Sequence, residues 1–91
     1  MADGSEDEVV RDLRARITEL DDAIFDAVNR RLDLVARLKR HKEERGYGFV
    51  DPEREERMVA AQASRNRGPL SDEGLRRFYA QLLELVKREL G

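Results

Sequence analysis

The apolar positions of this chain repeat with the spacing of an α-helix near both of its ends. Between Val10 and Lys42, one set of positions follows spacings of four and three residues in turn without interruption. These positions are Val10, Arg14, Ile17, Asp21, Ile24, Val28, Arg31, Val35, Leu38 and Lys42. This spacing places them along one stripe of a single helix, whereas a strand places every second residue on one face. The same kind of repeat runs from Leu75 to Leu90. The pattern therefore predicts an all-α protein.

Capping and breaking residues give the bounds of the first helix. Ser5 and Glu8 have the spacing of a capping box, so we expect the helix to begin near Glu6. Nothing between that point and Gly46 breaks a helix. The prediction is a long helix over residues 6–45, preceded by disordered residues 1–5.

Two shorter helices are predicted after Gly46. Asp51 followed by Pro52 starts one of them, because aspartate caps helices and proline is favoured at their first position. Ser71 caps the other, after the breaking pair Gly68-Pro69. We therefore expect helices over residues 52–66 and 71–90, and one domain over residues 1–91.

The first predicted helix is too long for a domain of this size. Its length of about 40 residues corresponds to about 60 Å, whereas a compact domain of 91 residues is about 30 Å across. Much of its apolar stripe would be bare in a monomer. A two-fold symmetric pair covers such a stripe, because the same surface of each copy covers the other. The sequence thus predicts a two-fold symmetric homodimer in which the long helices cover each other, with an ordinary coiled coil as the alternative.

Composition narrows the possible chemistry. The chain has no cysteine and a single histidine, which disfavours a disulfide framework, a thiol catalyst and a His-rich metal site. Its 18 Lys and Arg nearly balance its 20 Asp and Glu, which argues against a general nucleic-acid binder. Neither a signal peptide nor an apolar run of about 18 residues is evident. We expect a cytoplasmic protein with no cofactor, no metal, and no membrane or nucleic-acid partner.

Three cations interrupt the apolar stripe of the first helix, namely Arg14, Arg31 and Lys42. Burial of an unpaired charge costs on the order of several kcal/mol. A single cation can extend to solvent or pair with an acid such as Asp21. Three together favour a bound anion.

The spacing of the two arginines indicates how such an anion is held. Arg14 and Arg31 are 17 residues apart, about 26 Å along one helix, so they cannot meet the same small ligand within one subunit. In an antiparallel dimer with its axis near Phe25, Arg14 of one subunit lies opposite the stretch between Arg31 and Lys42 of the other. This arrangement predicts two shared sites for a small compound with at least two negative groups.

The start of the second helix adds an acid and a cation, because Asp51, Arg54 and Glu55 share one face by helical spacing. Together with the charged stripe, this element resembles the AroQ-type chorismate mutases (type II, all-α) over about residues 10 to 90. The matching elements are Leu13-Arg14-x-x-Ile17-x-x-Leu20-Asp21, Arg31-x-x-Leu34-Val35, Lys42 and Val50-Asp51-x-x-Arg54-Glu55. The resemblance implies an intertwined all-α homodimer with two shared active sites. It also implies an isomerase that converts chorismate to prephenate by a Claisen-type sigmatropic rearrangement.

The resemblance further implies roles for the charged residues of the stripe. Arg14 from one subunit and Arg31 from the other clamp the two carboxylates of the substrate, since guanidinium groups bind carboxylates in a bidentate manner. Lys42 faces the ether oxygen, where negative charge develops in the transition state. No covalent intermediate and no proton transfer are needed.

At the start of the second helix, the resemblance implies contacts to other parts of the same substrate. Glu55 accepts a hydrogen bond from the substrate hydroxyl, with help from the backbone of Asp51. Arg54 supports the carboxylate end of the site. The Asp51-x-x-Arg54-Glu55 element resembles most closely the chorismate mutase domains that are fused to, or work with, DAHP synthases.

Three positions depart from the family pattern. Val86 stands where the family often has a small polar residue, Leu90 where a Gln or Glu often joins the lysine at the ether oxygen, and Lys39 where a Gly is frequent. Val86 and Leu90 are therefore only weakly implied as substrate contacts, and Lys42 lacks a second donor. The expected consequence is a low intrinsic activity. Short family members with a similar Leu-Gly ending depend on a complex with DAHP synthase, so such a synthase is the expected partner.

Other functions stay open on the sequence. A sister enzyme, either an isochorismate-pyruvate lyase or a 4-amino-4-deoxychorismate mutase, fits the same clamp, because Glu55 suits a hydroxyl or an amine. A non-catalytic sensor of an aromatic-pathway metabolite is favoured by Val86 and Leu90. A plain helical interaction module is permitted by the continuous spacing but disfavoured by the inward cations. Tight binding of the ligand without turnover would indicate the sensor, and the absence of ligand binding would indicate the interaction module.

Overall fold

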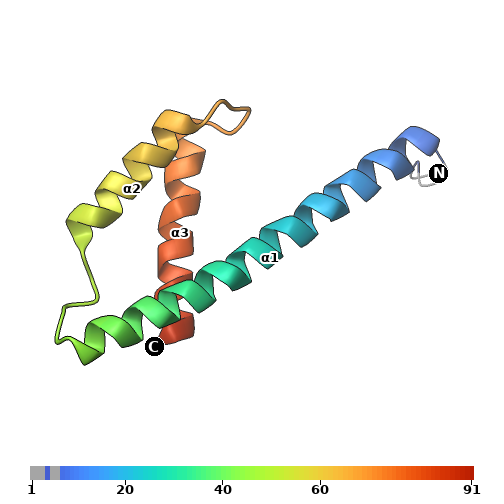
Figure 1. The fold of residues 1–91 in the computed structure, drawn as a ribbon. Helices are drawn as coiled ribbons and strands as arrows, with labels where there is room; N and C mark the ends of the chain where they lie inside the picture. The colour runs from blue at the N-terminus through green and yellow to red at the C-terminus, as the bar shows by residue number, and fades with distance from the viewer. Residues whose placement is uncertain (1–3, 5–6) are drawn as a thin grey trace. The chain divides into compact units, whose positions relative to one another are not determined.

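The computed structural model describes residue 4 and residues 7–91, and three helices make up most of this part of the chain. They are α1 (Glu8–Glu44), α2 (Pro52–Arg65) and α3 (Asp72–Leu90), as Figure 1 shows. No strand occurs in the described part, so the prediction of an all-α chain with a long first helix is confirmed. The observed bounds differ from the predicted ones by at most two residues. Within the same described part, no helix combines the length and apolarity that a membrane span requires.

The N-terminal end of α1 is capped by Asp7. Its side-chain oxygen Oδ1 accepts hydrogen bonds from the amides of Val9 and Val10, at 2.7 and 3.4 Å. Aspartate is a strong helix cap, because its carboxylate satisfies amides that lack a partner in the first turn. The predicted cap Ser5 and the predicted helix start at Glu6 lie outside the described residues. The expected disorder of residues 1–5 likewise falls outside them, apart from residue 4.

The C-terminal end of α1 is closed at Gly46, as predicted. Gly46 has a φ of +72°, a conformation that other residues rarely adopt. Its amide donates to the Glu43 carbonyl at 3.2 Å, and the Tyr47 amide donates to the Lys42 carbonyl at 2.8 Å. These two bonds form a Schellman motif, which satisfies carbonyls of the last helical turn.

The chain forms two compact units, residues 1–34 and residues 35–91. The described part of the first unit is the N-terminal portion of α1, and none of its side chains is buried. A lone helix has no neighbour against which to bury an apolar stripe, so this unit has no core of its own. The large apolar side chains that it leaves exposed are Val9, Leu13, Ile17, Leu20, Ile24, Phe25 and Leu34.

The second unit contains the end of α1 together with α2 and α3. The start of α2 contacts the end of α3 through Glu55 and Lys87, so these two helices run antiparallel (Figure 1). Val86 of α3 is 6% exposed and is the one buried hydrophobic residue in the described part of the chain. Most of the other apolar side chains at the helix contacts are half-buried. The core of this unit is therefore small.

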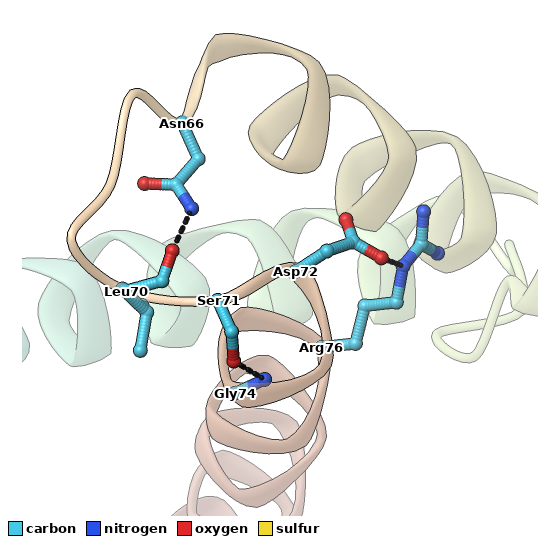
Figure 2. A network of polar contacts seen from close by, with 6 residues as sticks. All are labelled: Asn66, Leu70, Ser71, Asp72, Gly74 and Arg76. Atoms are coloured by element: carbon cyan, nitrogen blue, oxygen red, sulfur yellow. Dashed lines mark hydrogen bonds and ion pairs between the residues drawn. The ribbon is translucent and has the colours of Figure 1, made fainter.

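The connection from α2 to α3 is held by hydrogen bonds at both of its ends, which Figure 2 shows. Asn66 Nδ2 donates to the Leu70 carbonyl at 2.7 Å, and Ser71 Oγ accepts from the Gly74 amide at 3.0 Å. The second bond is an N-cap, so the predicted role of Ser71 is confirmed. A Cβ atom on Gly74 would lie 2.9 Å from Leu70 Cδ1, so glycine at this position lets Leu70 lie over the first turn of α3.

Candidate active site

The first unit carries the two arginines that were predicted to clamp an anion. Arg14 is exposed, whereas Arg31 is half-buried, and the Nη1 atom of Arg31 is buried without a hydrogen-bond partner. A buried donor without an acceptor is costly, and an oxygen of a bound anion would satisfy it. Both arginines belong to one helix, about 26 Å apart. A single subunit therefore does not bring them to the same small ligand.

The second unit carries Lys42, in the last turn of α1. The residue is half-buried, and its backbone carbonyl is engaged by Tyr47. A cation at this end of a helix is favoured by the helix dipole, which is a sufficient structural reason for a positive residue here. The dipole alone does not explain why Lys42 continues the helical spacing of Arg14 and Arg31.

None of the predicted cations pairs with an acid in the described part of the chain. Its ion pairs involve Arg16, Arg76, Arg77 and Lys87. Asp21, the acid that could have neutralised a cation of the stripe, has no ion pair there either. The positive charge is therefore available to an external anion. The predicted site cations, none of which has a carboxylate partner among the described residues, are Arg14, Arg31, Lys42 and Arg54.

Asp51 organises the first turn of α2. Its Oδ1 accepts from the Arg54 amide at 3.1 Å, and its backbone carbonyl accepts from the Glu55 amide at 3.1 Å. Pro52 takes the first helical position, as predicted. The cap thus holds Arg54, which is exposed, and Glu55, which is half-buried, in one helical turn.

Glu55 has a partner that the sequence did not indicate. Lys87 Nζ lies 4.0 Å from Glu55 Oε1, and the two side chains are 44% and 30% exposed. Two opposite charges at this distance attract one another, although solvent weakens the attraction. Because the pair joins α2 to α3, its prediction would have required the register of these helices. No spacing within either helix indicates it.

A shallow depression lies next to Glu55, with a volume of about 550 Å³. Pro52, Glu56 and Val59 line it together with Arg76 of α3. The Arg76 Nε atom is held by Asp72 Oδ2 at 2.9 Å (Figure 2). The mixture of two carboxylates with an arginine that is already paired gives this depression no strong preference for an anion. No three His, Asp or Glu side chains converge as metal ligands anywhere in residues 7–91.

Val86 and Leu90, the two weakly implied substrate contacts, both lie near the end of α3 in the second unit. Val86 belongs to the core, so its side chain has a packing role. Leu90 is half-buried, and its carbonyl accepts a hydrogen bond of 2.8 Å from Lys39 Nζ. This bond ties the last residue of α3 to the end of α1. In the sequence, Lys39 stands at a position where the family often has a Gly, and no spacing along the chain indicates this contact.

Comparison with known proteins agrees with this arrangement of helices. The model of the family described as chorismate mutase type II matches residues 13–89. The chain is similar to a chorismate mutase from Thermus thermophilus, solved as form I and form II. Against form I the identity is 29% and the TM-score 0.84, with 87% of this chain and 99% of that chain covered. Against form II the identity is 28% and the TM-score 0.86, with coverages of 89% and 92%. The comparison with curated proteins found no match.

Proposed function

We propose, because this chain belongs to the chorismate mutase type II family of isomerases, that it converts chorismate to prephenate. The observation that carries the proposal is the family match over residues 13–89, which includes every predicted site residue except Leu90. The uncompensated cations of α1 give independent support. A dianionic substrate is the kind of ligand that such cations bind.

The proposed reaction suits a site made of cations and hydrogen-bonding groups. It breaks the ether C–O bond and forms a C–C bond within the same molecule, so no proton or leaving group passes to the protein. The site has to hold the compact conformer of the substrate and stabilise negative charge on the ether oxygen. Arg31 and the Arg14 of the partner subunit hold the carboxylates, and Lys42 stabilises the oxygen. Arg54 adds positive charge at the carboxylate end.

The proposed site requires a homodimer. The exposed apolar side chains of the first unit have no partner within that unit, and a second copy of the same helix covers them. The antiparallel pairing that does so also brings Arg14 of one subunit to Arg31 of the other. We propose that residues 1–91 act as a single domain in this dimer.

The Glu55–Lys87 pair favours a hydroxyl over an amine on the substrate. Glu55, helped by the backbone of Asp51, accepts a hydrogen bond from that hydroxyl in the proposed complex. A protonated amine at this position would place a third charge near Lys87, which repels it, and would gain less from a carboxylate that already has a cation at 4.0 Å. This observation favours chorismate over 4-amino-4-deoxychorismate.

A DAHP synthase is the proposed partner of the dimer. Val86 and Leu90 leave the end of α3 without a polar side chain at the positions where the family often has one. Loss of one donor at a developing charge typically lowers the rate by about 10²- to 10³-fold. We expect the dimer alone to be a slow enzyme that a DAHP synthase accelerates.

The proposed function is tested by the loss of chorismate absorbance with purified protein, with the product identified by chromatography. The expected result is prephenate, formed slowly by the protein alone and faster after addition of the DAHP synthase of the same organism. Pyruvate release from isochorismate would identify a lyase instead. Chorismate binding without turnover, even with the synthase, would identify a sensor. If chorismate does not bind at all, the remaining interpretation is a helical interaction module without a metabolite site.

Leu90→Gln is expected to raise kcat by about tenfold, because its amide supplies a second hydrogen-bond donor near Lys42. This increase in kcat is smaller than the usual effect of a hydrogen-bond donor in a natural active site, because neighbouring residues do not hold the new side chain in place. Leu90→Met is the matched comparison, because it fills a similar volume without a donor. Equal kcat values for the two variants would contradict the prediction.

A further inference from the structure

One ammonium group links three segments of the second unit. Lys39 Nζ of α1 donates to the Leu90 carbonyl of α3 at 2.8 Å, in a partly buried position. The same Nζ lies 5.8 Å from the centre of the Phe49 ring, in the connection between α1 and α2. We propose that Lys39 is a positioning residue that fastens the end of α3 beside Lys42 and so raises the catalytic rate. The inference rests on the proposed function for its effect on rate.

The hydrogen bond from the Lys39 ammonium to the Leu90 carbonyl has a charged donor and an acceptor at a helix end, which makes it strong. The last four carbonyls of a helix have no partner within the helix, and the helix dipole makes this end negative. A lysine ammonium is therefore a favourable partner, and a hydrogen bond from a charged donor is stronger than one between neutral groups. Partial burial reduces the competition from water. Lys39 thus stabilises the position of the last turn of α3.

The contact with Phe49 extends the link to the connection before α2. A cation within about 6 Å of an aromatic ring centre is attracted to the face of the ring. Phe49 is half-buried and lies two residues before Asp51, the cap of α2. Lys39 therefore also limits the movement of the segment that leads to Asp51 and Glu55. Lys39 thus joins the end of α1 both to the last residue of α3 and to the connection that precedes α2.

The place of Lys39 on α1 connects this link to the chemistry. It precedes Lys42 by three residues, so the two side chains lie on neighbouring positions of one helix face. By holding Leu90, Lys39 attaches the last turn of α3 to α1 about one helical turn before Lys42. In the proposed arrangement this apolar turn shields the Lys42 ammonium from water. Exclusion of water strengthens the interaction between a cation and a developing negative charge. Loosening of this turn would weaken the contribution of Lys42 without removing any group that binds substrate.

Kinetics of Lys39 variants test the proposal. Lys39→Met keeps the aliphatic stem but loses the ammonium, and we expect kcat to fall by about tenfold while KM changes by less than about twofold. Lys39→Arg keeps a cation that reaches a carbonyl, so it should recover most of the lost rate. Arg40→Met is the matched control for loss of one positive charge, because Arg40 is exposed and makes no ion pair in the described part of the chain. It should keep the wild-type kcat.

Amide hydrogen exchange in residues 86–90 tests the same proposal without an activity assay. In Lys39→Met we expect faster exchange in this turn, whereas Lys39→Arg and Arg40→Met keep the wild-type rates. If Lys39→Met does not fold, as judged by circular dichroism, Lys39→Gln is measured in its place, since its shorter side chain does not span the same distance. Unchanged exchange in the folded neutral variant would overturn the proposal.

The remaining outcomes separate the two proposals. A raised KM with an unchanged kcat would make Lys39 a substrate ligand and would overturn its positioning role. Protein that is inactive on chorismate under all conditions would remove the proposed function and with it the effect on rate. Faster exchange in Lys39→Met would still uphold the fastening of α3 in that case. Failure of one proposal is therefore distinguishable from failure of the other.

Discussion

Arg31→Ala and Lys42→Ala are each expected to lower kcat/KM for chorismate by about 10³-fold. Arg31 provides a bidentate donor for a substrate carboxylate, and Lys42 faces the oxygen on which charge develops. The Nη1 atom of Arg31 is buried and has no partner in the described part of the chain, so its hydrogen-bonding capacity is free for a ligand. Steady-state kinetics measured by loss of chorismate absorbance check both variants.

Thermal unfolding of the same variants distinguishes a binding role from a structural one. Neither Arg31 nor Lys42 has an ion pair within the described residues, and burial of an unpaired charge is unfavourable. Their removal should therefore not lower the unfolding temperature in the way that loss of a salt bridge does. Arg30→Ala, an exposed neighbour on the same helix, is the matched control and should keep wild-type kinetics. A loss of activity that follows a loss of stability would contradict the assignment.

A mixture of Arg14→Ala and Arg31→Ala subunits is expected to recover about a quarter of the wild-type activity, although each variant alone is nearly inactive. In the proposed dimer, Arg14 of one subunit and Arg31 of the other serve the same site. Random pairing makes about half of the dimers mixed, and each mixed dimer holds one site with both arginines intact. The measurement is the kcat of the two proteins after they are unfolded and refolded together.

The control for this experiment is a mixture of Arg31→Ala with Lys42→Ala. These two residues come from the same subunit in each proposed site, so every site of a mixed dimer lacks one of them. No recovery is expected. Recovery in both mixtures, or in neither, would contradict a site shared in the proposed way. A monomeric protein, as judged by its mass in solution, would contradict it directly.

The family could be predicted from the sequence because its residues form an ordered set along the chain. The order and spacing of Arg14, Arg31, Lys42 and Glu55 do not depend on the details of packing, and the family match over residues 13–89 confirms the prediction. The roles of these residues, the dimer and the DAHP synthase partner remain predictions. Each of these predictions concerns the binding of a second molecule to the chain, and the spacing of residues in the sequence does not show what binds.

The neighbours of the candidate site were not predictable in the same way. Lys39 and Leu90 are 51 residues apart, and Glu55 and Lys87 are 32 residues apart. Each contact depends on how far one helix is shifted and rotated against another. A rotation that moves one side chain away from the contact leaves the sequence pattern of both helices unchanged.

The sequence by itself determined the helices, because their bonds and caps join residues that are close along the chain. The stop at Gly46 and the caps Asp51 and Ser71 each act over a few positions, and all three agree with the structure. The sequence also determined which cations share a helical stripe with the apolar residues of α1, since helical spacing alone assigns residues to one face. Only the tertiary structure decided that Lys39 holds the end of α3 and that Lys87 accompanies Glu55. These contacts arise from packing between helices, where the distance between two side chains is set by the register of the helices and not by their separation in sequence.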